Sequence, residues 1–116
     1  YKTYANMWIG MYNENKDPSN KKDRLFFNAP SLIMVVSDSQ VNASLASSNM
    51  ELMTDALGLG TFFSGFFVRA AQENKAIKEL LGLKETEQIV TCMVIGYPNV
   101  KFQRTVPRKE ASITWR

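Results

Sequence analysis

Two continuous apolar runs constrain the fold of this chain more than any other feature. The first is "APSLIMVVSD", residues 29–38, and the second is "EQIVTCMVIGY", residues 87–97. Both are short, rich in valine and isoleucine and bounded by proline or charged residues, which is typical of strands. Because neither run alternates apolar with polar residues, both strands are predicted to be buried on two faces.

Segments with helical periodicity separate these runs. One helix is predicted near the start of the chain, and another is predicted from Val68 to Leu81, where Gly82 ends it. The first helix carries one apolar face, with residues at spacings of three and four: Tyr1, Tyr4, Ala5, Trp8, Met11 and Tyr12. Residues 13–24 contain no apolar side chain and are predicted to form a polar surface loop.

A longer helix is predicted to follow the first strand. Asp38 or Ser39 can cap its beginning, and Gly58 supplies a left-handed residue just after its end near Leu57. Its inner face is predicted to hold Leu45, Asn49, Leu52, Met53 and Ala56. Alternating helices and strands of this kind favour a sheet covered by helices.

The stretch "DALGLGTFFSGFF", residues 55–67, contains three glycines and four phenylalanines. Its glycines do not have the G-x-G-x-x-G spacing of a dinucleotide loop, and a helix precedes them instead of following them. Residues 60–67 are predicted to be extended and to place phenylalanines in the core. The Ser64-Gly65 pair inside that run is unusual, because a glycine in a strand often marks close approach of a ligand to the backbone.

Composition excludes several kinds of chemistry. The chain has no histidine and one cysteine, which removes Ser-His and Cys-His catalysis and any internal disulfide. A single cysteine indicates a reducing compartment, so a cytoplasmic location is expected. No apolar stretch is long enough to span a bilayer, and no membrane partner is expected.

Positive charge is concentrated at the end of the chain. Residues 1–100 hold nine basic and ten acidic residues, whereas residues 101–116 hold five basic residues and one acidic residue. Such a narrow basic segment suits one anionic group better than a long polyanion, so a nucleic-acid partner is not expected.

Several motifs in order resemble the C-terminal half of the FMN-dependent nitroreductase family, from about Asn28 to Trp115. They are "NAPSLIMVVSD", "SSNMELMTDALGLGT", "FFSGFF", "LLGLKETEQIVTCMVIGYP" and "RTVPRK". The resemblance implies an α+β fold, an α/β/α sandwich with a mixed, mainly antiparallel sheet, in an intertwined homodimer. Residues 1–116 would then be the C-terminal portion of one FMN-binding domain, with residues 101–116 as a basic extension that crosses to the partner.

The resemblance also implies a flavin enzyme. FMN would carry the chemistry, with NAD(P)H as electron donor and a nitroaromatic, quinone or similar small molecule as acceptor, so no catalytic side chain and no metal site are expected. Ser64 and Gly65 occupy the place where the family offers backbone N–H groups to the flavin ring, and Phe63 would help to wall the pocket. Arg108 and Lys109, with Arg104, occupy the place of the phosphate-binding basic residues.

One departure from the family pattern keeps an alternative open. The family has an "Arg-Ser-x-Arg"-like segment that holds phosphate and flavin ring, and nothing like it appears in these residues. The chain is therefore expected to be a partial domain with about half an FMN site. The alternative is a non-catalytic domain that uses this fold for dimerisation or ligand binding.

Overall fold

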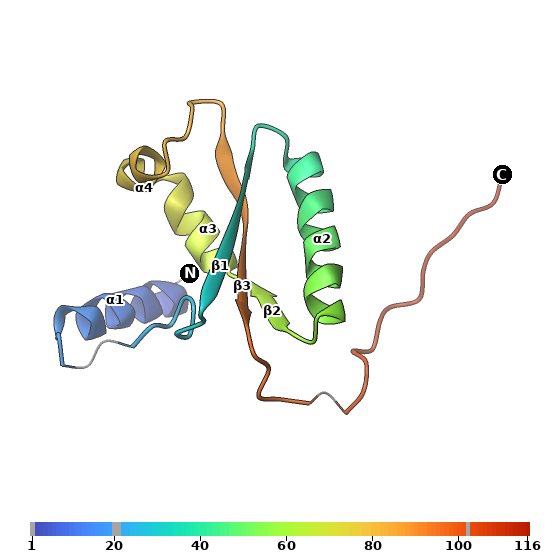
Figure 1. Cartoon of the computed structure of the whole chain (residues 1–116), viewed down its shortest axis with the longest axis horizontal. Helices are drawn as coiled ribbons and strands as arrows, with labels where there is room; N and C mark the ends of the chain where they lie inside the picture. The colour runs from blue at the N-terminus through green and yellow to red at the C-terminus, as the bar shows by residue number, and fades with distance from the viewer. Residues whose placement is uncertain (1, 20–21, 102) are drawn as a thin grey trace.

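The computed structural model describes residues 2–19, 22–101 and 103–116, so Tyr1, predicted on the apolar face of the first helix, lies outside the described residues. The described elements run in the predicted order of helices and strands (Figure 1). They are α1 (Lys2–Lys16), β1 (Ser31–Ser37), α2 (Gln40–Ala56), β2 (Gly60–Phe63), α3 (Gly65–Gln72), α4 (Lys75–Leu80) and β3 (Gln88–Gly96).

The three strands form one antiparallel sheet with the order β1-β3-β2. Ile33 of β1 and Phe63 of β2 both lie opposite Met93, which places β3 in the centre. This central position explains why Cys92 and Met93 are fully buried. The predicted strands at residues 29–38 and 87–97 and the expected α+β class are confirmed.

Helices cover both sides of the sheet. Figure 1 shows α2 on one side and α3 and α4 on the other, with α1 near the lower end of α3. Only a few contacts hold α1: Trp8 packs edge-on against Phe66 of α3 with ring centroids 5.5 Å apart, and no residue of α1 is fully buried. Among the described helices, none is both long and apolar enough to cross a membrane.

The cap predictions for α2 are confirmed, but its predicted inner face is wrong. Ser39 caps the helix by accepting a hydrogen bond from the Asn42 N–H, and Gly58 has a left-handed φ of +73°. The face packed on the sheet instead carries the small residues Ala43, Ser47 and Thr54.

Small side chains let α2 lie close to the sheet, and their hydroxyls are satisfied there. The Ser47 hydroxyl lies 2.6 Å from the Thr91 hydroxyl of β3, and Thr54 donates to the Met50 carbonyl. The residues predicted to face the sheet are exposed: Leu45, Asn49, Leu52, Met53 and Ala56.

Three other boundaries differ from the predictions. The first helix continues to Lys16, so the polar segment predicted as a loop over residues 13–24 is helical at its start, and residues 20–21 of it lie outside the described residues. Strand β2 ends at Phe63, and the phenylalanines that follow belong to α3 instead of an extended run. The helix predicted from Val68 to Leu81 is two helices, because Asn74 adopts an extended conformation and caps α4 through the Ile77 N–H.

The basic extension leaves the end of β3 without regular structure. Residues 103–116 are exposed and form no helix or strand, and the segment "SITWR", residues 112–116, has no strand partner among the described residues. Figure 1 shows the extension running away from the sheet on the side of α2.

Candidate functional site

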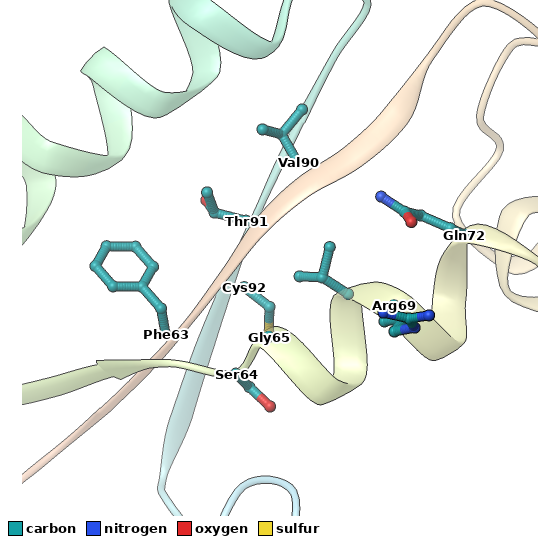
Figure 2. Close-up of a pocket in the computed structure, with 9 residues that line it drawn as sticks. Phe63, Ser64, Gly65, Arg69, Gln72, Val90, Thr91 and Cys92 are labelled. Carbon is teal, nitrogen blue, oxygen red and sulfur yellow. The ribbon is translucent and has the colours of Figure 1, made fainter. Parts of the chain in front are cut away.

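A hollow of about 420 Å³ lies where β2 turns into α3, beside the central strand (Figure 2). Its walls come from the β2–α3 junction, from the first turns of α3 and from the part of β3 beyond the end of β2. The lining residues are Phe63, Ser64, Gly65, Val68, Arg69, Gln72, Val90, Thr91 and Cys92. Its volume falls within the range of about 300–1,000 Å³ that is usual for small-molecule sites.

Strand β3 is irregular where it borders the hollow. Val35 of β1 pairs with Thr91, but Val36 pairs with Ile89, so Val90 is an extra residue in the ladder. Such bulges are over-represented next to active sites, where they redirect side chains. Val90 thus lies in the wall of the hollow without a partner in β1.

Gly65 begins α3 although neither its backbone nor its neighbours require a glycine there. Gly58 and Gly82 have left-handed φ angles, whereas Gly65 does not. A Cβ atom added at Gly65 would meet nothing within 4 Å in the described chain. Glycine destabilises a helix relative to alanine. The missing side chain at residue 65 therefore leaves open space beside the start of α3 at a cost in the stability of the protein.

Ser64 is buried, and both of its hydrogen-bond donors have partners in the chain. Its backbone N–H donates to the Cys92 carbonyl at 2.8 Å, and its hydroxyl donates to the Leu25 carbonyl at 3.1 Å. Of the two backbone donors predicted from the sequence, only the Gly65 N–H therefore lacks a partner among the described residues. The first helical hydrogen bond of α3 is made by the Val68 N–H, so the N–H groups of residues 65–67 begin the helix without intrahelical partners.

Two polar residues of α3 that line the hollow were not predicted from the sequence. Arg69 and Gln72 lie on α3 one and two turns after Gly65, and Arg69 is the one charged residue in the described lining. Arg69 and Gln72 follow Gly65 by four and seven residues, which places all three on one face of a helix. A helix predicted to begin at Gly65 would therefore have indicated both residues. The thiol of Cys92 also lines the hollow, and burial raises its pKa, which keeps it protonated at neutral pH.

The predicted basic residues do not share this hollow. Arg104 and Arg108 line a second one of about 710 Å³, together with Asp55 at the end of α2 and the residues Gln103, Thr105 and Val106. Lys109 is exposed and lines neither hollow. Three of the six predicted site residues thus lie at the β2–α3 junction, namely Phe63, Ser64 and Gly65. The other three, Arg104, Arg108 and Lys109, lie in the extension.

The fold and the first hollow define an α+β protein with a ligand-sized recess at a strand-to-helix junction, where the Gly65 N–H has no partner among the described residues. The family model described as the nitroreductase family matches residues 7–97, and the chain belongs to this family. This match begins before Asn28, where the recognised motifs begin, and ends before the basic extension. Among curated proteins, none matches the chain significantly.

Solved structures of flavin enzymes share the fold. A nitroreductase with bound FMN from Bacteroides fragilis NCTC 9343 has a TM-score of 0.66 and 18% identity, over 90% of this chain and 65% of its own. An FMN-dependent nitroreductase from Clostridium difficile R20291 has a TM-score of 0.61 and 18% identity, over 90% of this chain and 68% of its own. The chain therefore spans about two thirds of the length of these structures.

Proposed function

We propose that this chain is the part of an FMN-dependent oxidoreductase that holds one edge of the flavin ring at the N-terminus of α3. The observation that carries the proposal is Gly65, which leaves open space beside a free N–H group in a recess of ligand size. Family membership and the fold shared with FMN nitroreductases support it. FMN, when bound, supplies hydride or electron transfer from NAD(P)H to a nitroaromatic, quinone or similar acceptor.

The residues of the recess fit such a ring edge. The Gly65 N–H and the N-terminal end of α3 favour negative charge, as a reduced flavin ring requires of its surroundings. Arg69 adds a positive side chain one turn further along α3. Phe63, which is partly exposed, offers an apolar wall on the β2 side.

Phosphate binding is assigned to the basic extension. Arg108, with Arg104 and Lys109, supplies cationic side chains, and the planar guanidinium of Arg108 can donate two parallel hydrogen bonds to phosphate oxygens. Because these residues lie apart from Gly65 within one chain, the proposal requires the extension to reach the flavin site of a second copy. The exposed course of residues 103–116 agrees with such a role.

A homodimer also accounts for apolar side chains that the single chain leaves uncovered. Val41, Leu45 and Leu52 lie on the face of α2 opposite the sheet, and each is more than 60% exposed. Full burial of such a side chain stabilises by about 1.5–3 kcal/mol. We therefore assign this face of α2 to the interface with the partner subunit.

The test is to purify the full-length protein and record its visible spectrum. Flavin absorbance that NAD(P)H bleaches is the expected result. A protein that quenches the fluorescence of added FMN, but whose bound flavin is reduced by dithionite and not by NAD(P)H, would favour the non-catalytic alternative. A colourless protein that does not quench FMN in a titration would refute the assignment of the flavin site.

A further inference from the structure

Ser64 stands immediately before α3 but does not cap it, whereas the residues before α2 and α4 cap those helices. Ser39 accepts a hydrogen bond from the Asn42 N–H at the start of α2, and Asn74 accepts one from the Ile77 N–H at the start of α4. Ser64 occupies the same position at α3, but its side chain makes no cap hydrogen bond. Its hydroxyl donates to the Leu25 carbonyl instead, which turns the oxygen away from the helix.

The Leu25 carbonyl is presented by a turn that Asp23 organises. The Asp23 carboxylate accepts hydrogen bonds from three backbone N–H groups, those of Leu25 at 3.0 Å, Phe26 at 2.8 Å and Asn28 at 3.0 Å. Within this turn Phe27 and Asn28 have left-handed φ angles of 54° and 55°. Consecutive left-handed residues other than glycine are strained and persist only where surrounding contacts impose them. The Asp23 carboxylate supplies those contacts.

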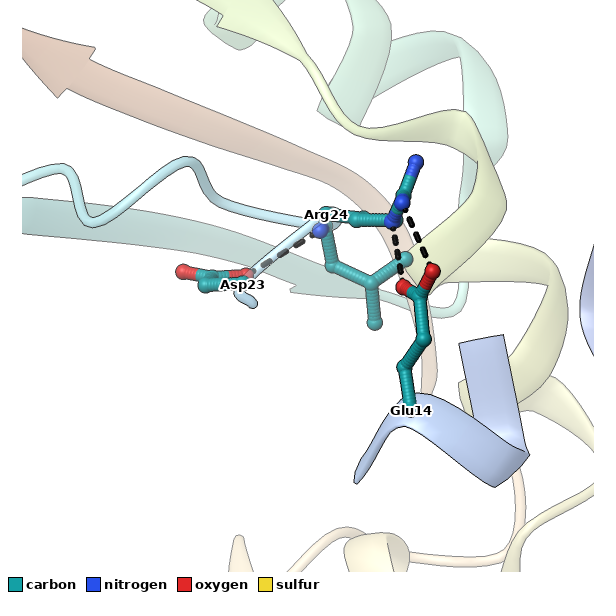
Figure 3. Close-up of polar contacts among 4 residues, drawn as sticks. Glu14, Asp23 and Arg24 are labelled. Atoms are coloured by element: carbon teal, nitrogen blue, oxygen red, sulfur yellow. Dashed lines mark hydrogen bonds and ion pairs between the residues drawn. The ribbon is translucent and has the colours of Figure 1, made fainter. Parts of the chain in front are cut away.

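Two further contacts hold the turn in place against the helices. Arg24 forms a two-pronged ion pair with Glu14 of α1, with distances of 2.8 and 2.9 Å (Figure 3). On the other side, the ring of Phe26 packs against Phe67 of α3 with centroids 5.1 Å apart. The turn is thus fixed relative to both α1 and the first turn of α3.

We propose that Asp23 is a positioning residue for the flavin site: by holding the Leu25 carbonyl against the Ser64 hydroxyl, it prevents Ser64 from capping α3. The N–H groups at the start of α3 then remain available to a ligand in the recess. If the turn relaxes, the Ser64 hydroxyl is released and competes for those same N–H groups, as serine normally does before a helix. This inference rests on the proposed function, because the ligand concerned is the flavin.

The experiment is a double-mutant cycle on the full-length protein, with the Kd for FMN measured by fluorescence quenching. Asp23→Ala is expected to weaken FMN binding about fivefold, which corresponds to the value of one helix cap, about 1 kcal/mol. In the S64A background the same change at Asp23 is expected to alter the Kd by less than twofold, because no hydroxyl remains to compete. Asp17→Ala is the matched control, since the Asp17 carboxylate also accepts hydrogen bonds from a nearby backbone N–H and hydroxyl, both of Ser19, but bonds to no residue of the turn that carries the Leu25 carbonyl.

A purely structural role for Asp23 gives a different result, namely an equal loss of affinity in both backgrounds, and that result would overturn the inference. An unchanged Kd in Asp23→Ala would overturn it as well. If Asp23→Ala does not fold, as judged by circular dichroism, Asp23→Asn retains one acceptor oxygen for the turn, and its smaller loss must likewise disappear with S64A. Absence of FMN binding by the unmodified protein is a distinct outcome, which overturns the proposed function and this inference with it.

Discussion

Replacing Gly65 by alanine tests whether glycine is needed at this position by the fold of the chain or by a bound flavin. In the described chain the added methyl group would enter open space, and the backbone of Gly65 is not left-handed. Alanine at a compatible helical position stabilises by about 0.4–1 kcal/mol, mainly because it restricts the unfolded chain. For a domain of this size, that gain corresponds to an increase in Tm of about 2–6 °C.

The same methyl group should obstruct the flavin. Inserting a methyl group into a filled site typically costs about 1–3 kcal/mol, so the Kd for FMN should rise by at least about fivefold and by more than a hundredfold at the upper end. Gly65→Val, with a β-branched side chain, should weaken binding further. Gly65→Ala should therefore make the FMN-free protein more stable and at the same time lower its affinity for FMN.

Thermal unfolding by circular dichroism and FMN fluorescence titration measure the two quantities independently. Gly58→Ala is the matched control, because Gly58 has a φ of +73° and lies outside the recess. It should destabilise the protein by about 1–2 kcal/mol and leave the affinity for FMN unchanged. If Gly65→Ala is more stable and binds FMN as tightly as the unmodified protein, the flavin is not at the start of α3.

Three further predictions concern the extension, the interface and the turn. Arg108→Ala should weaken FMN binding while the protein remains a folded dimer, and equal affinity would show that the phosphate is held elsewhere. Leu52→Asp on the outer face of α2 should convert the proposed dimer to a monomer in light scattering, because it places a charge in the proposed apolar interface; an unchanged mass would exclude this face.

Burial disfavours the charge of Asp23, but the N–H groups of Phe26, Asn28, Leu25 and Phe27 outweigh it and lower its pKa in the folded protein. The resulting stabilisation is fully present above the unfolded pKa of about 3.9 and is lost as pH falls through the lower folded pKa. The difference between the urea midpoints of the unmodified protein and Asp23→Ala should therefore be largest at pH 7 and shrink as the pH falls below the unfolded pKa, and a constant difference would contradict this reasoning.

Sequence patterns were sufficient for strands β1 and β3 and for the helix ends at Gly58 and Gly82. The apolar runs around Val35 and Met93 contain enough β-branched and large apolar residues to be strands in any compact arrangement. Gly58 and Gly82 end helices because their left-handed conformation is a local property of the backbone. A role for Gly65 in a ligand site stays a prediction, suggested locally by a glycine that strand packing did not explain.

The burial of α2 and the start of α3 depended on tertiary packing. Helix α2 has apolar residues on two faces, and only the fit of Ala43 and Ser47 against β3 decides that the small face is inside. The phenylalanine run after Gly60 is compatible with either strand or helix, and the helix begins at Gly65 because the Val68 N–H donates to the Ser64 carbonyl.

Local sequence patterns therefore predict the strands, the helix ends at Gly58 and Gly82 and the resemblance to a flavin-binding family. Each depends on residues close together in the chain. Tertiary packing decides which N–H groups at the start of α3 lack partners among the described residues and which polar side chains share the recess. Those properties depend on Leu25, Ser64 and Cys92, residues far apart in sequence whose hydrogen bonds form only when the turn, the helix and the central strand pack together.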